Sequence, residues 1–503
     1  MTVLLTGKIH AIFGVVIWIL HKLETEFANM IRVLYVGSGL CSTQSMAAKL
    51  PKHLMNHSAG VEVDVVVPHI SGIDEGEGKL AERLVKCEPY VDGAHHHVTV
   101  LEGRRDGHIR TLYMHADCLS NGLGLNDDHG IRASVVYAHA VCAWLSQATR
   151  AYDVVHCDGM ETAIIPTIMR KFYGHDARVA AVKSVVSVKG IEDKAGIPMY
   201  WMEKIGFSAD MASSDGMEFY GKLSILKGAY LHADAIAFPN TCIKRRIEKN
   251  RGKDIGMEGV LFDKLDKLYT IGRGICGKCA NPETDKAIEA NYSIRDMSGK
   301  TKCKNALTLK YRLKKGQPVV AYIGNLDADS GLSLVNDILD DLMDNKVNLV
   351  IAGTGTDNQI KTVNGWKDEF KGQIAFLNEK TSCEDVRRIL SAADILLLPP
   401  KHENTCTLHL VAMRYGCVVV ARNQGCVAND IQRVKNIEKI ADYDNGFTFA
   451  SFDSDEFYDA VMDALDVYES EDWNKVRENA MSKSVTLNDT ANDCVSIYLA
   501  LKG

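Results

Sequence analysis

Two short groups of residues carry side chains that bind transition metals. Cys276 and Cys279 form a C-G-K-C sequence, and three consecutive histidines occupy positions 95–97. A structural zinc site needs four ligands, usually from two such cysteine pairs, and only the isolated Cys303 follows nearby. Adjacent histidines on a loop seldom converge on one ion. The sequence therefore predicts no metal site, and we expect the histidine run to be exposed to solvent.

Composition and charge exclude several classes of protein. The 14 cysteines are scattered over 503 residues, which favours reduced, mostly buried thiols and a cytoplasmic protein. A net charge of -7 without a long basic run argues against a nucleic-acid partner. The apolar segment 11–20 is shorter than the ~20 residues that a transmembrane helix needs. Membrane association through this segment is the minority alternative, and residues 1–30 are expected to be an extension outside the fold.

The elements that would position a site alternate between strands and helices. From residue 31 onward, β-branched runs are separated by longer helical stretches, which is typical of parallel sheets covered by helices. The sequence predicts an α/β fold with two doubly wound domains. The first has strands at residues 32–36, 61–67, 153–156, 179–182 and 233–237, and the second has strands at residues 318–323, 347–352, 373–376, 395–398 and 417–421.

A polar stretch at residues 281–315 is expected to connect the two domains. With the boundary near Lys304, the domains span residues 31–304 and 305–485. Residues 486–503 are expected to form a C-terminal helix that packs back across the domains. Ligands of open parallel sheets bind beyond the carboxyl ends of the strands, so the functional site is expected in a cleft between these domains.

Several short strings occur in the order and at the separations found in one enzyme family. They include D-V-V-H-C from Asp153, G-M-E-F-Y-G from Gly216, G-T-G from Gly353, A-A-D-I-L-L-L-P from Ala392 and A-M-R-Y-G from Ala412. Together they resemble bacterial glycogen synthase and plant starch synthase, glycosyltransferase family 5. The resemblance runs from about residue 31 to the end. It implies the GT-B fold, in which two Rossmann-like domains face each other across a cleft.

The resemblance implies transfer of glucose from ADP-glucose or UDP-glucose to an α-1,4-glucan, with retention of configuration and no metal or other cofactor. The departing diphosphate gains negative charge, which cations and helix-terminal NH groups must stabilise. The family's arginine and lysine for this task lie in S-R-L-T-x-Q-K-G, which here reads G-N-L-D-A-D-S-G. Asn325 and Ser330 replace the two cations, and Asp327 and Asp329 add negative charge. These changes predict impaired turnover.

Other family positions also hold unsuitable residues. The K-T-G-G-L loop should fall within residues 36–50, but that interval is about six residues too short, and Gly37 and Gly39 then serve a strand-to-helix turn. The string H-D-W-H has become D-G-M-E, which places Gly159 where the family has a carboxylate. In an uninterrupted alignment, a sugar-contacting histidine falls on Ser184.

A further loop, E-P-C-G-L-T-Q in the family, reads E-N-T-C-T-L-H from Glu403 to His409. Glu403 is the candidate catalytic residue, although a glutamate near a helix start also stabilises the helix dipole. Cys406 replaces a glycine and would crowd the sugar. By resemblance, the remaining donor-binding candidates are Gly353, Gly355, Thr407, Leu408 and Arg273. Lys401, Arg422 and Arg273 could also rebuild a phosphate site with a different geometry.

Three hypotheses follow. In the first, the chain is a non-catalytic relative that binds an α-glucan or a protein partner, with ADP-glucose or UDP-glucose as a residual ligand. In the second, it is an active glycosyltransferase with an altered donor or acceptor. In the third, it is a structural subunit whose apolar amino-terminal segment packs against a neighbour or a membrane. The first hypothesis is favoured, because the family's site residues are replaced while its framework strings are retained. The sequence does not predict an oligomeric state.

Overall fold

The computed structural model describes residues 30–39, 46–57, 60–70, 80–103, 108–188, 196–250, 257, 260–277, 280–378, 381–401, 407–483 and 485–502. These residues form two compact units. Unit 1 comprises the described residues up to Phe238, Arg246–Ile271 and those from Thr490 onward. Unit 2 comprises Pro239–Arg245 and Gly272–Asp489.

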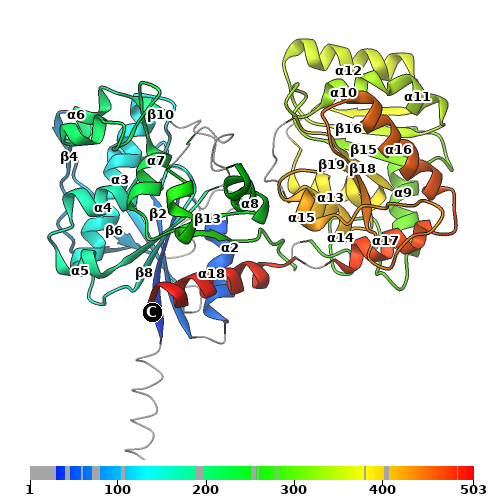
Figure 1. The fold of residues 1–503 in the computed structure, drawn as a ribbon. Helices are drawn as coiled ribbons and strands as arrows, with labels where there is room; N and C mark the ends of the chain where they lie inside the picture. The colour runs from blue at the N-terminus through cyan, green and yellow to red at the C-terminus, as the bar shows by residue number, and fades with distance from the viewer. Residues whose placement is uncertain are drawn as a thin grey trace, which may run out of the picture. The chain divides into compact units, whose positions relative to one another are not determined.

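Unit 1 contains a nine-stranded sheet in the order β14-β13-β9-β8-β1-β2-β7-β6-β3 (Figure 1). Neighbouring strands are parallel except that β6 runs antiparallel to β3 and β7. The strand order reverses at β1, so the loops after β1 and β8 lie at a topological switch point. The strands are β1 (Ile31–Gly37), β2 (Val61–Pro68), β3 (Ala81–Arg83), β6 (Thr99–Glu102), β7 (Arg110–His115), β8 (Val154–Asp158), β9 (Lys183–Ser187), β13 (Ala235–Phe238) and β14 (Leu268–Thr270).

Helices and small strands complete unit 1. Its longest helix, α3, begins where the Asp127 side chain accepts a hydrogen bond from the Gly130 N–H at 2.7 Å, and most of it is buried. The helices are α2 (Met46–Met55), α3 (Asp128–Gln147), α4 (Ile165–Phe172), α5 (Ala177–Ala181), α6 (Trp201–Ile205) and α7 (Ile225–His232), with 3₁₀ turns at Asp117–Leu119, Ala209–Ala212 and Phe262–Lys267. The small strands are β4 (Tyr90–Val91), β5 (Ala94–His95), β10 (Gly196–Pro198), β11 (Glu218–Phe219) and β12 (Lys222–Ser224). The division between the two units falls within helix α8 (Thr241–Asn250).

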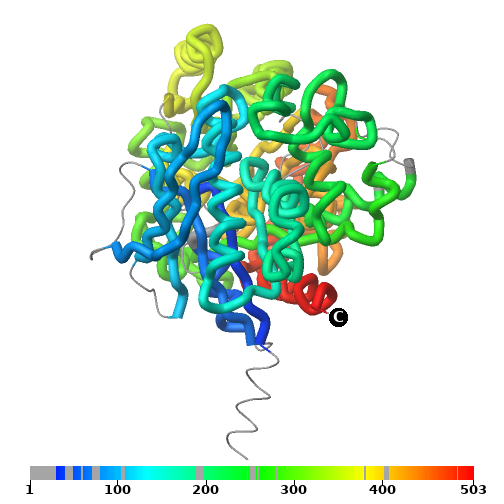
Figure 2. Tube along the Cα trace, turned by 90° about the vertical axis from the view of Figure 1, so that its left-hand side faces the viewer, coloured from blue at the N-terminus to red at the C-terminus, as the bar shows by residue number. Residues whose placement is uncertain are grey.

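The C-terminal helix α18 (Leu487–Lys502) returns the chain to unit 1. Cys494, Val495 and Tyr498 are buried against Val33 of β1 and Val63 of β2 in one apolar cluster. Both ribbon and tube views show this helix, in red, beside the blue amino-terminal elements (Figures 1 and 2). The last helix therefore packs back onto unit 1, and its expected packing across both domains stays a prediction.

Unit 2 contains a six-stranded parallel sheet in the order β17-β16-β15-β18-β19-β20. Val319 and Ala321 of β15 belong to one core cluster, whereas Val320 and Tyr322 belong to the cluster on the other face. Both faces of the sheet are therefore covered, as all-parallel sheets require. The strands are β15 (Val319–Ile323), β16 (Asn348–Ala352), β17 (Ile374–Leu377), β18 (Ile395–Leu398), β19 (Val418–Arg422) and β20 (Gly446–Phe449).

The helices of unit 2 cover both faces of this sheet. They are α9 (Ser298–Lys310), α10 (Leu332–Asp337), α11 (Leu339–Asp344), α12 (Asp357–Glu369), α13 (Cys383–Ala392), α14 (Leu408–Arg414), α15 (Val427–Asp430), α16 (Ser454–Tyr468) and α17 (Trp473–Ser482). The strand order reverses between β15 and β18, which sets the second switch point of the chain.

The structure confirms an α/β fold with two Rossmann-like units and corrects two predicted elements. Residues 179–182, expected as a strand, lie largely in helix α5, because the Asp176 carboxylate accepts hydrogen bonds from the N–H groups of Arg178 and Val179. The polar stretch 281–315, expected as a connection, contains helix α9, and unit 2 begins again at Gly272, ahead of the boundary expected near Lys304.

The structure shows where most cysteines and the three consecutive histidines lie. Of the 11 described cysteines, eight are buried. His95 and His97 are exposed, and the rings at positions 95–97 contact Glu88 O, Val91 O and Glu88 Oε1 respectively, so they do not converge on one point. In the described part of the chain, no helix is long and apolar enough to cross a membrane. The same residues hold no cluster of three or more His, Cys, Asp or Glu able to bind a metal.

Candidate functional site

Positions 325 and 330, where the resemblance implies an arginine and a lysine, lie in the loop after β15. The Tyr322 hydroxyl donates to Asn325 O at 2.8 Å, and burial raises the pKa of this tyrosine. The Asp327 carboxylate accepts from the Ser330 N–H at 2.7 Å, which fixes the turn into α10. The side chain of Asn325 is exposed. The aspartate that adds negative charge at position 327 thus also has a structural task.

This loop is packed tightly onto the loop after β18. Gly331 has φ +83°, and a Cβ atom there would lie 1.8 Å from Pro399 O. The Lys401 N–H donates to Asp329 O at 2.8 Å. Only glycine fits at position 331, because both the left-handed backbone and the close approach exclude a side chain. The two loops on either side of the switch point are therefore held together through their backbones.

The predicted donor-binding residues Gly353 and Gly355 belong to the same loop cluster. They follow β16, and a Cβ atom on Gly353 would lie 1.8 Å from Gly324 O. A Cβ atom on Gly355 would lie 2.8 Å from the Cβ of Leu326, a buried residue of the loop after β15. The structure therefore brings these glycines against the loop that lacks the family cations.

We expect Gly353→Ala to lower the free energy of unfolding by about 1–2 kcal/mol, because its Cβ would overlap the Gly324 carbonyl. Gly365→Ala is the matched control. Gly365 lies inside α12, and a Cβ atom added there would meet nothing within 4 Å, so alanine should stabilise by about 0.5–1 kcal/mol. Urea denaturation measures both. Equal stabilities for the two variants would contradict the close packing of these loops.

Thr407 and Leu408, two further donor-binding candidates, mark the start of α14, where Thr407 is the N-cap residue. The following residue, His409, is 2% exposed, and its Nε2 lies 2.9 Å from an Asp430 carboxylate oxygen on α15. This pair could not be predicted from the sequence, because its members are 21 residues apart on two separate short helices. It fixes the helix start that carries Thr407 and Leu408.

Arg422 is already engaged by the backbone. Its Nε donates to Ala450 O at 3.1 Å and its Nη1 donates to Lys401 O. The guanidinium also lies 5.9 Å from the ring centroid of Phe452. Arg422 therefore stabilises the loops after β18 and β20, which limits its reach toward a phosphate.

The neighbours of Arg273, namely Gly274 and Ile275, pack against residues 485–487. A donor-binding role for Arg273 stays a prediction.

In unit 1, the edge of the sheet at which an open parallel sheet would bind a ligand lies at the carboxyl ends of β1, β8 and β9. Gly159, where the family has a carboxylate, has φ +104°, and its N–H donates to Ser187 O at 3.0 Å. This left-handed conformation strains any residue with a Cβ, so the turn itself favours glycine here. The turn thus favours a residue that brings no carboxylate to this edge.

The placement of the family histidine on Ser184 is wrong. Ser184 lies near the amino end of β9, where its N–H and hydroxyl donate to Asp234 at 2.8 and 3.0 Å. A ligand-contacting residue should instead follow the carboxyl end of the strand. That end is Ser187, which pairs with Asp158 of β8.

A buried hydrogen-bonded chain lies below this edge. The His156 ring contacts Ser187 Oγ at 2.6 Å through Nε2 and Tyr498 OH on α18 at 2.5 Å through Nδ1. Burial lowers the pKa of His156 to about 3, so the imidazole is neutral at physiological pH. This chain was not predicted from the sequence, although His156 lies in the D-V-V-H-C string. It ties Ser187 to the C-terminal helix.

Some predicted positions lie outside the described residues. These are the candidate catalytic residue Glu403, the neighbouring Cys406, Cys279 of the C-G-K-C sequence and the apolar segment 11–20. Their roles stay predictions.

Comparison with known proteins assigns both halves of the chain. Residues 44–262 match the starch synthase catalytic domain family, and residues 305–483 match glycosyl transferases group 1. Glycogen synthase 2 of Geobacter metallireducens is 26% identical over 463 residues, covering 90% of this chain and 94% of the relative. Glycogen synthase of Finegoldia magna is 27% identical over 461 residues, with the same shares covered.

Solved structures show the same fold. The catalytic domain of starch synthase IV from Arabidopsis thaliana, bound to ADP and acarbose, has a TM-score of 0.82 at 19% identity, covering 94% of this chain and 99% of that one. Sucrose-phosphate synthase from Thermosynechococcus elongatus has a TM-score of 0.58 at 12% identity, covering 94% of this chain and 99% of that one. The chain is therefore a glycogen- and starch-synthase-like protein of glycosyltransferase family 5, with the two-domain GT-B fold.

Proposed function

We propose that the protein is a glucosyltransferase that moves glucose from ADP-glucose or UDP-glucose to an α-glucan, with retention of configuration. The observation that carries the proposal is the alignment of relatives named glycogen synthase over 90% of the chain. These relatives favour an active enzyme over the non-catalytic protein that site loss alone predicted.

The loop cluster of unit 2 supplies the framework for a donor site. In an open parallel sheet, the loops after the strands beside a switch point form the ligand-binding edge. Here Gly331 and Gly353 let the loops after β15, β16 and β18 approach through their backbones. Backbone N–H groups and the start of α14 can then face a diphosphate, as helix N-termini do in other anion sites.

The proposed enzyme works with fewer cations than its relatives. Asn325 and Ser330 offer neutral polar groups where the resemblance implies an arginine and a lysine. Loss of one well-placed donor to a developing anion typically costs about 100- to 1,000-fold in rate. We therefore expect a slow transferase, in which Glu403 stabilises the cationic sugar as glucose leaves the nucleotide.

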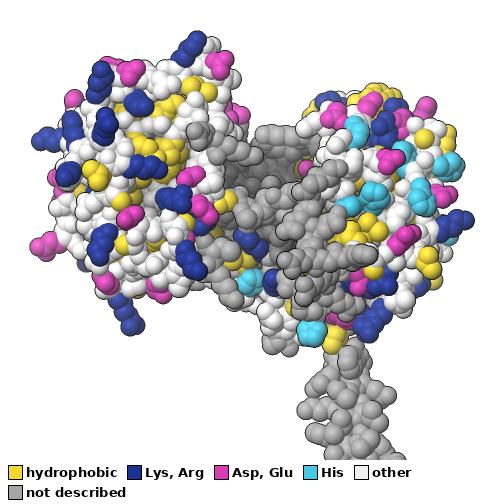
Figure 3. All heavy atoms as spheres, turned by 180° about the vertical axis from the view of Figure 1, so that it is seen from behind, with side chains coloured by type: hydrophobic (Ala, Val, Ile, Leu, Met, Phe, Trp, Pro, Cys, Tyr) yellow, Lys and Arg dark blue, Asp and Glu magenta, His cyan; other side chains and the backbone are white. Residues whose placement is uncertain are grey.

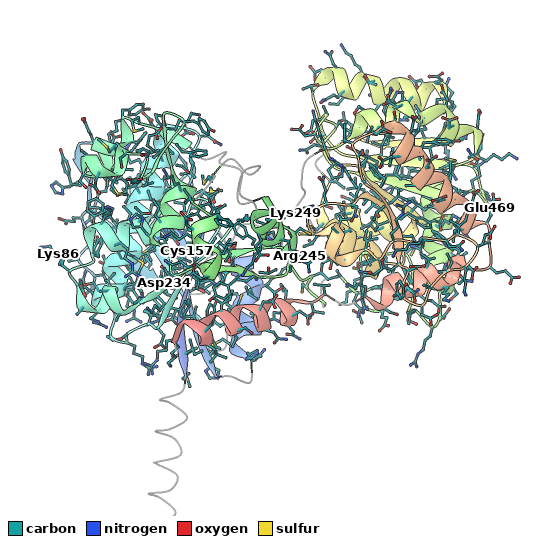
Figure 4. The ribbon with its side chains drawn as sticks, viewed as in Figure 1. Lys86, Cys157, Asp234, Arg245, Lys249 and Glu469 are labelled. Atoms are coloured by element: carbon teal, nitrogen blue, oxygen red, sulfur yellow. The ribbon has the colours of Figure 1, made fainter. Side chains whose placement is uncertain are left out.

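Substitution of the proposed catalytic glutamate tests this function. We expect Glu403→Gln to reduce glucosyl transfer by at least about tenfold, because the amide cannot stabilise a positive sugar in the same way. The matched control is Glu469→Gln, at an exposed position at the end of α16 (Figure 4). Labelled glucose incorporated into maltoheptaose is the readout. Equal rates for both variants would remove Glu403 from the mechanism.

A non-catalytic glucan-binding protein is the second candidate, and the loop after β15 favours it. This loop has no cation at positions 325 and 330, and the Asp327 carboxylate stands in the same turn. Under this alternative, a folded sample binds maltoheptaose but forms no labelled product from either donor. Calorimetric titration with the glucan, run beside the transfer assay, separates the two candidates.

A further inference from the structure

Two histidines meet at the carboxyl edge of the unit 1 sheet. Strands β2 and β7 are parallel neighbours, with Pro68 paired to Met114. The residues that follow this pair in the two chain segments are His69 and His115. The His69 N–H donates to Met114 O at 2.9 Å, which continues the ladder and fixes the His69 backbone beside β7.

The two rings point their Nδ1 atoms at each other. The Nδ1 atoms are 2.9 Å apart, the ring centroids are 5.0 Å apart, and the ring planes are inclined by 58°. The His69 ring also lies 5.9 Å from the buried Tyr113 ring in an edge contact. His69 is half-buried and His115 is exposed, so solvent reaches the pair.

This geometry suits cis ligation of one cation. In this contact one Nδ1–H donates to the other Nδ1, which of the two depending on the tautomer, and a cation held by both nitrogens would replace the shared proton. Metal–imidazole bonds of about 2.0–2.1 Å that meet at a right angle separate the nitrogens by about 2.9 Å, whereas a tetrahedral angle gives about 3.4 Å. The observed spacing matches the right angle. Ions with square-planar or octahedral preferences, such as Cu²⁺ and Ni²⁺, have this angle.

We propose that His69 and His115 form a two-histidine binding site for a late first-row divalent ion of the Cu²⁺ or Ni²⁺ type, with solvent water as the remaining ligands. The site is separate from the loop cluster of unit 2 and does not depend on the proposed transfer reaction. Its position at the carboxyl edge of β2 and β7 places a dication at the edge where open parallel sheets bind ligands.

Cu²⁺ titration of the full chain tests the site. Histidine side chains are also visible elsewhere on unit 1 (Figure 3), so the parent protein should first carry His95→Ala, His96→Ala and His97→Ala to remove the exposed run. We expect this parent to bind one Cu²⁺ ion with two equatorial nitrogens in its electron paramagnetic resonance spectrum. His69→Ala and His115→Ala should each weaken binding at least about tenfold, a change of ~1.4 kcal/mol.

His175→Ala, at another exposed histidine of unit 1, is the matched control and should leave the affinity unchanged. Because His115 is exposed, its variant should keep the parent's thermal unfolding midpoint, which separates loss of a ligand from loss of the fold. The proposal is overturned if the parent shows no Cu²⁺ bound through two nitrogens. It is also overturned if His69→Ala and His115→Ala bind Cu²⁺ as tightly as His175→Ala, because the two imidazoles then share only a proton.

Discussion

Asn325→Arg combined with Ser330→Lys should raise glucosyl transfer by about 100-fold or more. The two substitutions return cations to the positions where the resemblance implies diphosphate contacts, and one such contact is typically worth about 100- to 1,000-fold. The exposed side chain at position 325 leaves room for an arginine. The measurement is the initial rate of labelled glucose transfer to maltoheptaose, for ADP-glucose and UDP-glucose separately.

The control for this gain must add the same charges elsewhere on unit 2. Asn345→Arg with Ser470→Lys does so at two exposed positions, after α11 and α16. If transfer rises equally in both double variants, general charge attraction explains the effect. If it rises in neither, the loop after β15 is not the diphosphate site.

Replacement of a buried lysine in unit 2 should have the largest effect on stability. The Lys300 Nζ donates to three backbone carbonyls, Leu390 O at 3.2 Å, Ser391 O at 3.3 Å and Tyr415 O at 2.9 Å. Lys300→Met fills the same space but leaves these acceptors with fewer donors. We expect the free energy of unfolding to fall by about 2–4 kcal/mol, measured by urea denaturation at pH 9.

The exposed lysine at position 302 of the same helix provides the control. Lys302→Met should change the free energy of unfolding by less than about 0.5 kcal/mol. Similar losses for the two variants would show that the buried hydrogen bonds of Lys300 contribute little.

The cost of Lys300→Met should also depend on pH. Burial lowers the pKa of Lys300 to about 8 in the folded protein, below the ~10.4 of an unfolded lysine. Between these values the unfolded chain binds the extra proton, so the contribution of Lys300 to stability rises as the pH rises through 8. The difference between wild type and Lys300→Met should therefore be larger at pH 9 than at pH 7, by roughly 1 kcal/mol. A difference that shrinks over this range would contradict the direction of the pKa shift.

The fold was largely predictable because β-branched runs identify buried parallel strands. Strands such as Ile395–Leu398 were predicted at their observed bounds. The strand predicted at residues 179–182 is wrong, because R-V-A-A-V suits either a helix or a strand. The hydrogen bonds that Asp176 accepts as N-cap stabilise the helix. The strand begins only at Lys183, so the family histidine was placed on Ser184, near the start of the strand and away from its carboxyl end at Ser187.

The sites were less predictable, because they depend on contacts between distant residues. His69 and His115 are 46 positions apart, and only the parallel register of β2 and β7 brings them together. Lys300 lies in a polar stretch, where a lysine is expected to be exposed. The absence of cations at positions 325 and 330 was visible in the sequence. The structural task of Asp327 in the same turn was not, because it requires the hydrogen bond to Ser330 N.

Glucose transfer by the unmodified protein is the property on which the proposed function most directly depends. The decisive measurement is labelled glucose incorporation from ADP-glucose and UDP-glucose into maltoheptaose, with a bacterial glycogen synthase at equal concentration as reference. We predict product above the enzyme-free blank, formed more slowly than by the reference and reduced in Glu403→Gln. No product from folded wild type, nor from the variant with Arg at 325 and Lys at 330, would contradict the proposed transferase and leave glucan binding as the function.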